Sequence, residues 1–315
     1  MADTTHPRPS WRDRVIDSSG VPIAARDFGG EGTPVVLVHG LGGTLEDWAA
    51  VAPRLTARHR VIATDLRNSG HSGDGPWEWG AVLGDIEAVV AEFGAEEPAV
   101  VGASLGGMVA VLWGERHPQC PGVANLDGHP VLGAGRRHPG MAPERAAEQR
   151  ERLGALFSAM EEQRASPLGP ADAGALAEAA RSSARRLGAS EDAFAASVYR
   201  SLTAADGAGR RFARPLREPL ARIRRAMEGL DLFAAYERTG ARTLAVLATE
   251  DTPGQEEFAD LMAAHRRGVG DALADLARER PRLRAARLAA GHAVLAERPA
   301  DVARLVLDFL AGDDG

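Results

Sequence analysis

The chain has 315 residues, of which 44% are hydrophobic and 26% charged, with a formal net charge of −7. This composition is typical of a globular protein with a sizeable core, and an acidic chain lacks the basic surface of most nucleic-acid-binding proteins. No apolar run approaches the roughly 18 residues of a membrane span, the first residues form no secretory signal, and Cys120 is the one cysteine. We expect a cytoplasmic protein that acts neither on nucleic acid nor on a membrane; the composition leaves its oligomeric state open.

The first part of the chain alternates strand and helix patterns. Two short strands, residues 14–20 and 21–30, are predicted to form a hairpin. Apolar runs typical of strands buried on both faces follow at residues 33–40, 60–67, 98–104 and 122–128. Helical patterns lie between them at residues 44–59, which Thr44 would cap, 77–94 and 105–118. This alternation predicts an α/β fold with a mostly parallel central sheet and helices on both faces.

Strand patterns disappear between residues 131 and 239, where we expect three or four amphipathic helices. This segment holds 18 Arg and 14 Asp or Glu, which gives it a formal net charge of +4. The remainder of the chain holds 19 Arg and 30 acidic residues, which gives it a formal net charge of −11. A cationic segment over an acidic body would favour an anionic substrate, although solvated helix faces give the same count. Large side chains in the segment would line a pocket or pack in a core: Phe157, Met160, Phe194 and Tyr199.

The strand pattern resumes after the helical segment, which is therefore an insertion between two strands. The closing elements are predicted as a strand at residues 242–250, a helix at 255–280, a strand at 282–292 and a helix at 299–310.

The stretch GASLGG, residues 102–107, places Ser104 in a sharp turn between a predicted strand and a helix. Glycines on both sides permit this turn and direct the hydroxyl above the sheet, as a nucleophile requires. The helix N-terminus stabilises negative charge, so the N–H of Leu105 is an expected oxyanion donor. HGLGG, residues 39–43, brings a second candidate donor, the N–H of Leu41, and the ring of His39 would hold that loop.

His292 directly follows the last predicted strand and is the candidate general base, which a serine nucleophile needs at neutral pH. A carboxylate must orient its ring. The favoured candidate is Asp251, at the end of the penultimate predicted strand. The alternative is Asp127, which ends the strand after the one that carries the nucleophile, and Glu250 is a weaker third candidate. All three lie at the carboxyl edge of the predicted sheet, where such sites form. This chemistry needs no metal and no cofactor.

The segments HGLGG, DLRNSGHS, GASLGG, ATED and AGHAVLAERP stand in the order found in α/β-hydrolase-fold serine hydrolases, and the chain resembles that family over residues 35–310. The resemblance implies a core of residues 1–130 and 240–315, a helical cap of residues 131–239, and cleavage of a carboxylic ester, lactone or related acyl bond through an acyl-enzyme. Asn68 replaces a usual glycine, and the long interval from Asp251 to His292 keeps Asp127 open as the acid.

The same scaffold serves other reactions, so alternatives remain open. One alternative is C–C bond hydrolysis or an isomerase or cyclase step in natural-product assembly. An alternative of another class is a small-molecule receptor that keeps the pocket without turnover.

Overall fold

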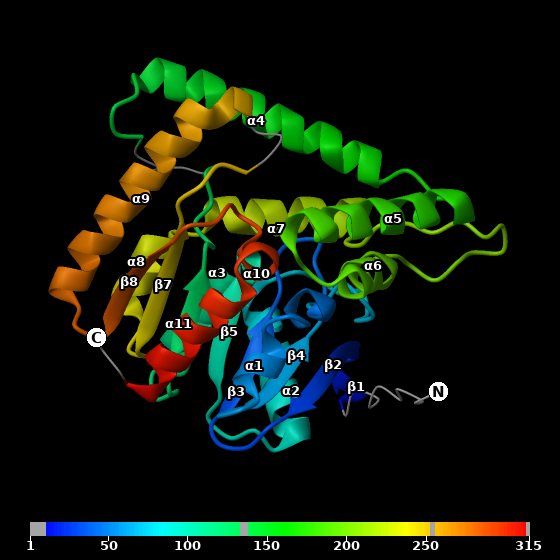
Figure 1. Ribbon diagram of the computed structural model, residues 1–315, viewed down its shortest axis with the longest axis horizontal. Helices are drawn as coiled ribbons and strands as arrows, with labels where there is room; N and C mark the ends of the chain where they lie inside the picture. Colours follow the sequence, from blue (N-terminus) through cyan, green and yellow to red (C-terminus); the bar gives the residue numbers. More distant parts are fainter. Residues whose placement is uncertain (1–10, 133–137, 253–255, 313–315) are drawn as a thin grey trace, which may run out of the picture.

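The computed structural model describes residues 11–132, 138–252 and 256–312. Its centre is an eight-stranded sheet in the order β1-β2-β4-β3-β5-β6-β7-β8 (Figure 1). Strand β2 runs antiparallel to both of its neighbours, and all other pairs are parallel, which confirms the predicted α/β class. The strands are β1 (Arg12–Ser18), β2 (Val21–Gly29), β3 (Pro34–Val38), β4 (Arg60–Thr64), β5 (Ala99–Ala103), β6 (Val123–Leu126), β7 (Thr243–Ala248) and β8 (Leu283–Leu288).

Helices cover both faces of the sheet because successive strand side chains point to opposite sides. Val35 and Leu37 of β3 pack in one apolar cluster, and Val36 and Val38 pack in the other. The first cluster includes side chains of α1 (Ala52–Leu55) and α11 (Pro299–Ala311), and α11 crosses in front of the sheet in Figure 1. The second cluster includes side chains of α2 (Trp79–Phe93), α3 (Leu105–Arg116), α8 (Leu232–Arg238) and α9 (Ala259–Glu279).

The predicted helix at residues 44–59 is broken in the structure. Thr44 caps a 3-10 helix, η1 (Leu45–Trp48), through a reciprocal hydrogen-bond pair with Asp47, and α1 begins four residues later. The intervening N–H groups of Ala49 and Val51 bond to carbonyls three residues back, as in a 3-10 turn. Pro53 lacks an N–H group, and a proline fits well only in the first turn of a helix. A new helix, α1, therefore begins at Ala52, one residue before Pro53.

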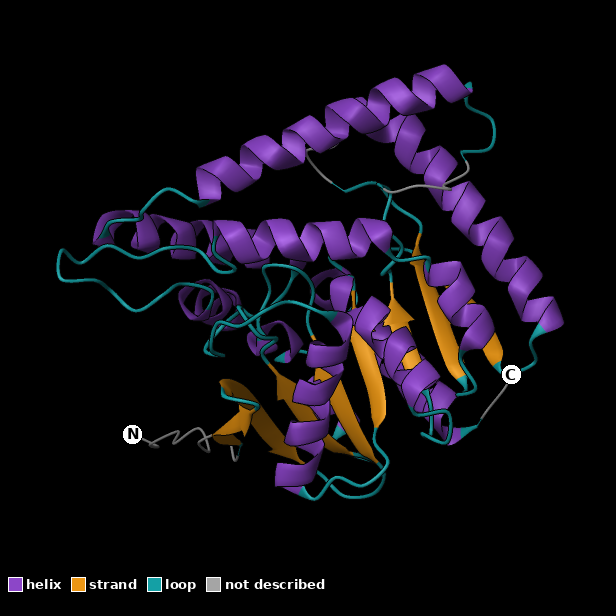
Figure 2. Ribbon diagram, turned by 180° about the vertical axis from the view of Figure 1, so that it is seen from behind, coloured by secondary structure: helices purple, strands orange, loops and turns teal. Residues whose placement is uncertain are grey.

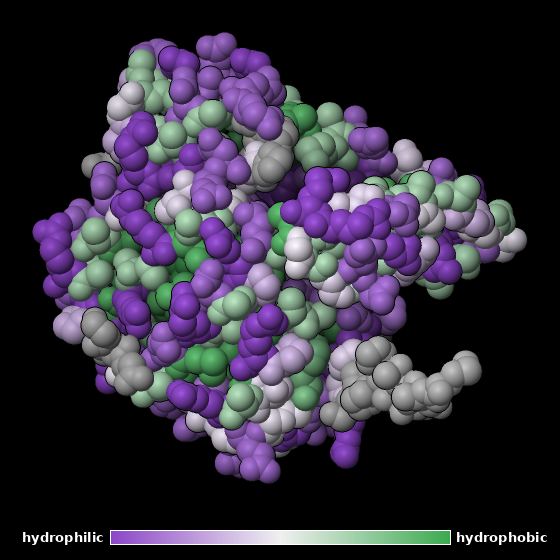
Figure 3. Space-filling view, in the orientation of Figure 1, coloured by the Kyte–Doolittle hydropathy of each residue, from purple (hydrophilic) through white to green (hydrophobic). Residues whose placement is uncertain are grey.

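Between β6 and β7 the described chain is helical, with more helices than the sequence predicted. These helices are α4 (Pro143–Arg164), α5 (Pro170–Leu187), α6 (Glu191–Arg200), α7 (Arg217–Gly229) and α8. Figures 1 and 2 show α4, α5 and α7 above one end of the sheet, and Figure 3 shows hydrophilic residues over much of the outer side of α4. Helix α8 instead packs beside α3 in the core.

Two different kinds of contact attach these helices to the rest of the molecule. On α6, the buried Arg200 donates to the Asp65 carboxylate at 2.7 Å and Ser197 donates to Asp47 at 2.6 Å. Helix α4 meets η2 (Glu256–Phe258) and α9 through a small apolar cluster that includes Leu153 and Leu261. The last short helix is α10 (Val294–Glu297). None of the helices in the described ranges combines the length and apolar character needed to cross a bilayer.

Candidate active site

Ser104 occupies the turn between β5 and α3. Its backbone, with φ of +53° and ψ of −118°, lies in a region that residues with a Cβ rarely adopt. A Cβ at Gly102 would lie 1.9 Å from the carbonyl oxygen of Gly106, and one at Gly106 would lie 2.1 Å from the carbonyl oxygen of Val38. Only glycine at these two positions lets the strand and helix approach this closely, and that approach enforces the strained turn at Ser104.

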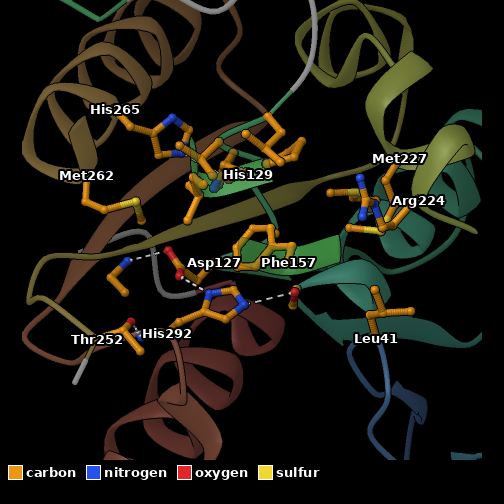
Figure 4. Close-up of a pocket in the computed structure, with 18 of the residues that line it drawn as sticks. Leu41, Asp127, His129, Phe157, Arg224, Met227, Thr252, Met262, His265 and His292 are labelled. Carbon is orange, nitrogen blue, oxygen red and sulfur yellow. Dashed lines mark hydrogen bonds and ion pairs between the residues drawn. The ribbon is translucent and has the colours of Figure 1, made fainter. Parts of the chain in front are cut away.

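His292, labelled in Figure 4, lies in the loop between β8 and α10. Its Nε2 lies 3.0 Å from Ser104 Oγ, and its Nδ1 lies 2.7 Å from Asp127 Oδ2. Because Nδ1 faces a carboxylate, the neutral ring carries its proton there and leaves Nε2 free to accept the serine proton. The segments that follow β5, β6 and β8 thus supply a hydroxyl, a carboxylate and an imidazole, respectively, and these three groups form one chain of contacts.

The carboxylate beside His292 belongs to Asp127, which corrects the expectation that Asp251 would lie there. Asp127 directly follows β6 and has a φ of +54°. Its N–H donates to the carbonyl oxygen of Val246 at 2.8 Å, and its Oδ1 accepts the N–H of Ala248 at 2.8 Å. The backbone of β7 therefore aims the other oxygen, Oδ2, at the imidazole.

Asp251 is carried away from His292 because the pairing of β7 with the β8 segment continues past the strand. The N–H of Thr249 donates to Leu288 at 3.0 Å, and that of Glu250 donates to Ala290 at 2.9 Å. Beyond this point the exposed Asp251 accepts from Arg266 at 2.6 Å. Glu250 lines the cavity described below, but the described side-chain partners of His292 are Ser104 and Asp127.

The surroundings of His292 raise its pKa above the ordinary value of 6.5. Burial, the largest influence, disfavours the imidazolium and lowers the pKa. The hydrogen bond and negative charge of Asp127, with the charge of Glu297, together outweigh burial. A raised pKa makes the imidazole a stronger base toward the serine hydroxyl.

Two side chains that the sequence analysis missed support the His292 loop. Glu297 of α10 accepts the N–H of Gly291 at 2.7 Å, and Thr252 accepts the N–H of His292 at 3.3 Å. An acidic residue shortly after the Gly-His pair was the available signal for Glu297. No pattern pointed to Thr252, because its contact joins two separate loops.

The expected oxyanion donors flank the serine on two sides. Leu105 opens α3, and the first N–H groups of a helix have no acceptor within the helix. Leu41 follows β3 and lines the same cavity as Ser104 (Figure 4). A Cβ at Gly40 would lie 3.2 Å from Ser104 Cβ, so the backbone of this loop passes directly beside the serine. His39 holds the loop, since its Nδ1 lies 2.7 Å from the carbonyl oxygen of Gly40.

A buried hydrogen-bond network supports the turn that carries Asp127. Asn125, fully buried on β6, accepts the N–H of Gly128 at 2.7 Å and donates to the Tyr236 hydroxyl at 2.8 Å. Tyr236 is itself fully buried on α8, and burial raises the pKa of its hydroxyl. The network ties the Asp127 turn to a helix of the core layer.

A cavity of about 500 Å³ opens over Ser104 and His292, a size that suits a small molecule. Apolar side chains form much of its wall, including Leu41, Phe157, Met160, Met227 and Met262. Phe157 and Met160 thus line a pocket, whereas Phe194 and Tyr199 are not among its described lining residues. Within the described ranges, no three His, Cys, Asp or Glu side chains gather as they would to hold a metal ion.

Comparisons with known proteins agree with this architecture. Residues 33–237 match the family described as alpha/beta hydrolase fold. A stretch of 110 residues is 34% identical to the dihydrolipoyllysine-residue acetyltransferase component of the acetoin cleaving system of Cupriavidus necator, covering 34% of this chain and 29% of that protein. A stretch of 109 residues is 33% identical to the pimeloyl-[acyl-carrier protein] methyl ester esterase of Edwardsiella ictaluri, covering 34% of this chain and 41% of that protein. The chain spans less than half the length of either relative.

The whole fold also resembles solved structures. The structure of E-2-(acetamidomethylene)succinate hydrolase superposes with a TM-score of 0.66 and 18% sequence identity, covering 96% of this chain and 99% of that one. At this identity the likeness is one of fold alone.

Proposed function

Because the chain belongs to the α/β-hydrolase fold family, we propose that it is a serine hydrolase acting on a carboxylic ester, lactone or related acyl bond of a small molecule. The observation that carries the proposal is the unbroken contact from Ser104 Oγ through His292 to Asp127 at the floor of a cavity. A serine hydroxyl becomes a useful nucleophile when a base accepts its proton and a third group orients that base.

In the proposed reaction, Ser104 Oγ attacks the carbonyl carbon while His292 Nε2 takes the hydroxyl proton. Asp127 stabilises the resulting imidazolium. The N–H groups of Leu41 and Leu105 bind the oxyanion, a contribution that can reach several kcal/mol. The imidazolium then gives its proton to the leaving alcohol, and an acyl-enzyme forms. A water molecule, deprotonated by the same imidazole, attacks the acyl carbon and releases the acid and free Ser104.

We propose residues 131–239 as a cap on a core of residues 1–130 and 240–315. Side chains of α4 and α7 line the cavity, including Phe157 and Met227, and such a cover excludes water from the reacting bond. Helix α8, the last helix within these bounds, packs beside α3 and contributes no residue to the cavity lining.

The test is the Ser104→Ala variant, assayed with p-nitrophenyl acetate and with a fluorophosphonate label. We expect turnover and labelling to disappear, while the matched control Ser166→Ala, an exposed serine outside the cavity, keeps both. Full labelling of the Ser104→Ala protein would overturn the assignment of the nucleophile. A wild-type protein that binds a ligand tightly without labelling or turnover would instead support a receptor.

A further inference from the structure

Three arginine side chains line the cavity, and two of them have carboxylate partners. Arg224 on α7 donates to Glu161 at 3.1 Å and to Glu228 at 3.3 Å. Arg266 on α9 donates to Asp251 at 2.6 Å. The positive charges of these two side chains are balanced by the protein itself.

Arg164, the last residue of α4, is the third. Its Nη2 donates to the carbonyl oxygen of Arg214 at 3.1 Å, which is a neutral acceptor. Across the part of the chain that the structure describes, no carboxylate oxygen lies within 4.0 Å of its guanidinium. Arg164 is exposed where it lines the cavity, so its guanidinium is accessible to a ligand. A guanidinium without a close counter-ion can take a carboxylate as its partner.

The position of this guanidinium places it beside the proposed reaction centre. Its Nη2 lies 3.2 Å, and its Cζ 3.6 Å, from where a Cβ of Gly42 would be. Gly42 is adjacent to Leu41, the proposed oxyanion donor. The same loop passes Ser104 at Gly40. Arg164 therefore stands over the loop that flanks the nucleophile, on the cavity side.

The opposite wall carries charges of both signs. Thr252 and His292 lie opposite Leu41 in Figure 4, and Glu250 and Arg266 line the cavity near Thr252, with Arg266 paired to Asp251. The unbalanced cation, Arg164, instead stands at the Gly42 end, where it attracts an anionic ligand.

We propose that Arg164 binds a carboxylate of the substrate, so that the preferred substrates are acyl compounds that carry a negative charge near the scissile bond. This inference rests on the proposed function and adds the substrate class to it. A guanidinium can bind a carboxylate through two parallel hydrogen bonds, which fixes the position of the bound molecule as well as its charge. The backbone acceptor at Arg214 leaves other N–H groups of Arg164 available for this purpose.

The test compares the mono-p-nitrophenyl esters of succinate and glutarate with p-nitrophenyl butyrate at one ionic strength. The wild type should prefer the monoanionic esters. In Arg164→Gln the ratio of kcat/KM for the anionic over the neutral ester should fall at least about tenfold, mainly through KM, because a charge-assisted contact is lost. Arg164→Lys keeps the charge and should recover part of the ratio. Arg217→Gln, an exposed arginine outside the cavity, is the matched control and should retain the wild-type ratio.

An unchanged ratio in a folded Arg164→Gln protein, with folding checked by circular dichroism, would overturn the inference. If the wild type cleaves none of the three esters and resists the fluorophosphonate label, the proposed function has failed on its own. The carboxylate site is then decided by calorimetric titration of wild type and Arg164→Gln with glutarate. Binding to the wild type alone supports the site, and equal binding or none to the wild type overturns it.

Discussion

The carboxylate of Asp127 is anchored by the backbone N–H of Ala248, which donates to its Oδ1 at 2.8 Å. The anchor lies on β7, so the orientation of the carboxylate is set by the sheet. The second oxygen is left to face His292 Nδ1 at 2.7 Å. One strand thus positions the acid that a neighbouring strand supplies.

Asp127→Asn should lower kcat for p-nitrophenyl acetate by about 10⁴-fold, as expected when the orienting acid of a triad is lost. The amide oxygen can still accept from Ala248, but the amide nitrogen then faces His292 Nδ1 and favours the wrong tautomer. Asp251→Asn is the matched control and should stay within about fivefold of wild type, since it loses only an exposed ion pair. A larger loss in Asp251→Asn than in Asp127→Asn would contradict the assignment.

The pH dependence should follow the raised pKa of His292. The base works only in its neutral form, and a raised pKa lets the imidazolium persist to higher pH. The kcat/KM for a neutral ester should therefore fall as pH decreases through a value above 6.5, with the activity fully present on the alkaline side. In Asp127→Asn the midpoint of the residual activity should move to lower pH, because the hydrogen bond and charge that raise the pKa are gone. A midpoint that stays in place would show that Asp127 does not act on His292.

Ser104→Gly should raise the free energy of unfolding by about 1 kcal/mol although the protein is inactive. The φ of +53° and ψ of −118° at Ser104 match the glycine-favoured position of a type II′ turn. Ser104→Ala retains a Cβ in this conformation and should show no comparable gain. Urea denaturation of the three proteins measures the difference, and equal midpoints for the two variants would argue against stored backbone strain.

Tyr236→Phe should lower the free energy of unfolding by about 1–3 kcal/mol. It removes the hydroxyl that lies 2.8 Å from the buried Asn125 amide and 3.0 Å from His129 Nε2, and leaves that amide only the longer contact of 3.4 Å to the Gly128 carbonyl oxygen. The chain has two tyrosines, and the second, Tyr199, is 46% exposed. Tyr199→Phe is thus a matched control, expected within about 0.5 kcal/mol of wild type. Urea denaturation measures both, and similar values for the two variants would remove the support that we assign to the Asp127 turn.

Much of the fold could be predicted because its signals are local. Buried strands have continuous apolar sequences, and the glycines around Ser104 indicate a tight turn that larger residues would not permit. His292 was identifiable because it follows the last strand directly. The broken helix at residues 44–59 was not foreseen, since its apolar spacing is helical throughout and a single proline, Pro53, decides where α1 begins.

The choice between Asp127 and Asp251 could not be made from the sequence, since both follow strands that end at the same edge. It depends on how far the β7 segment stays paired with the β8 segment and on the positive φ at Asp127, and neither has a local signal. The same holds for Arg164, which is one of 18 arginines in the helical segment. Its place over Gly42 follows from the docking of α4 and not from any spacing of residues.

Ser104 and Asp127 each stand one residue beyond adjacent strands, β5 and β6, with positive φ angles fixed by neighbouring backbone. The chemical centre is therefore built from parts of the chain where few substitutions are tolerated. Part of the cavity wall comes from α4, α7 and α9, whose side chains can be exchanged without moving that backbone. The cavity wall can therefore change by substitution more readily than the backbone that holds Ser104 and Asp127. Related proteins can in this way acquire new substrates while the catalytic residues stay the same.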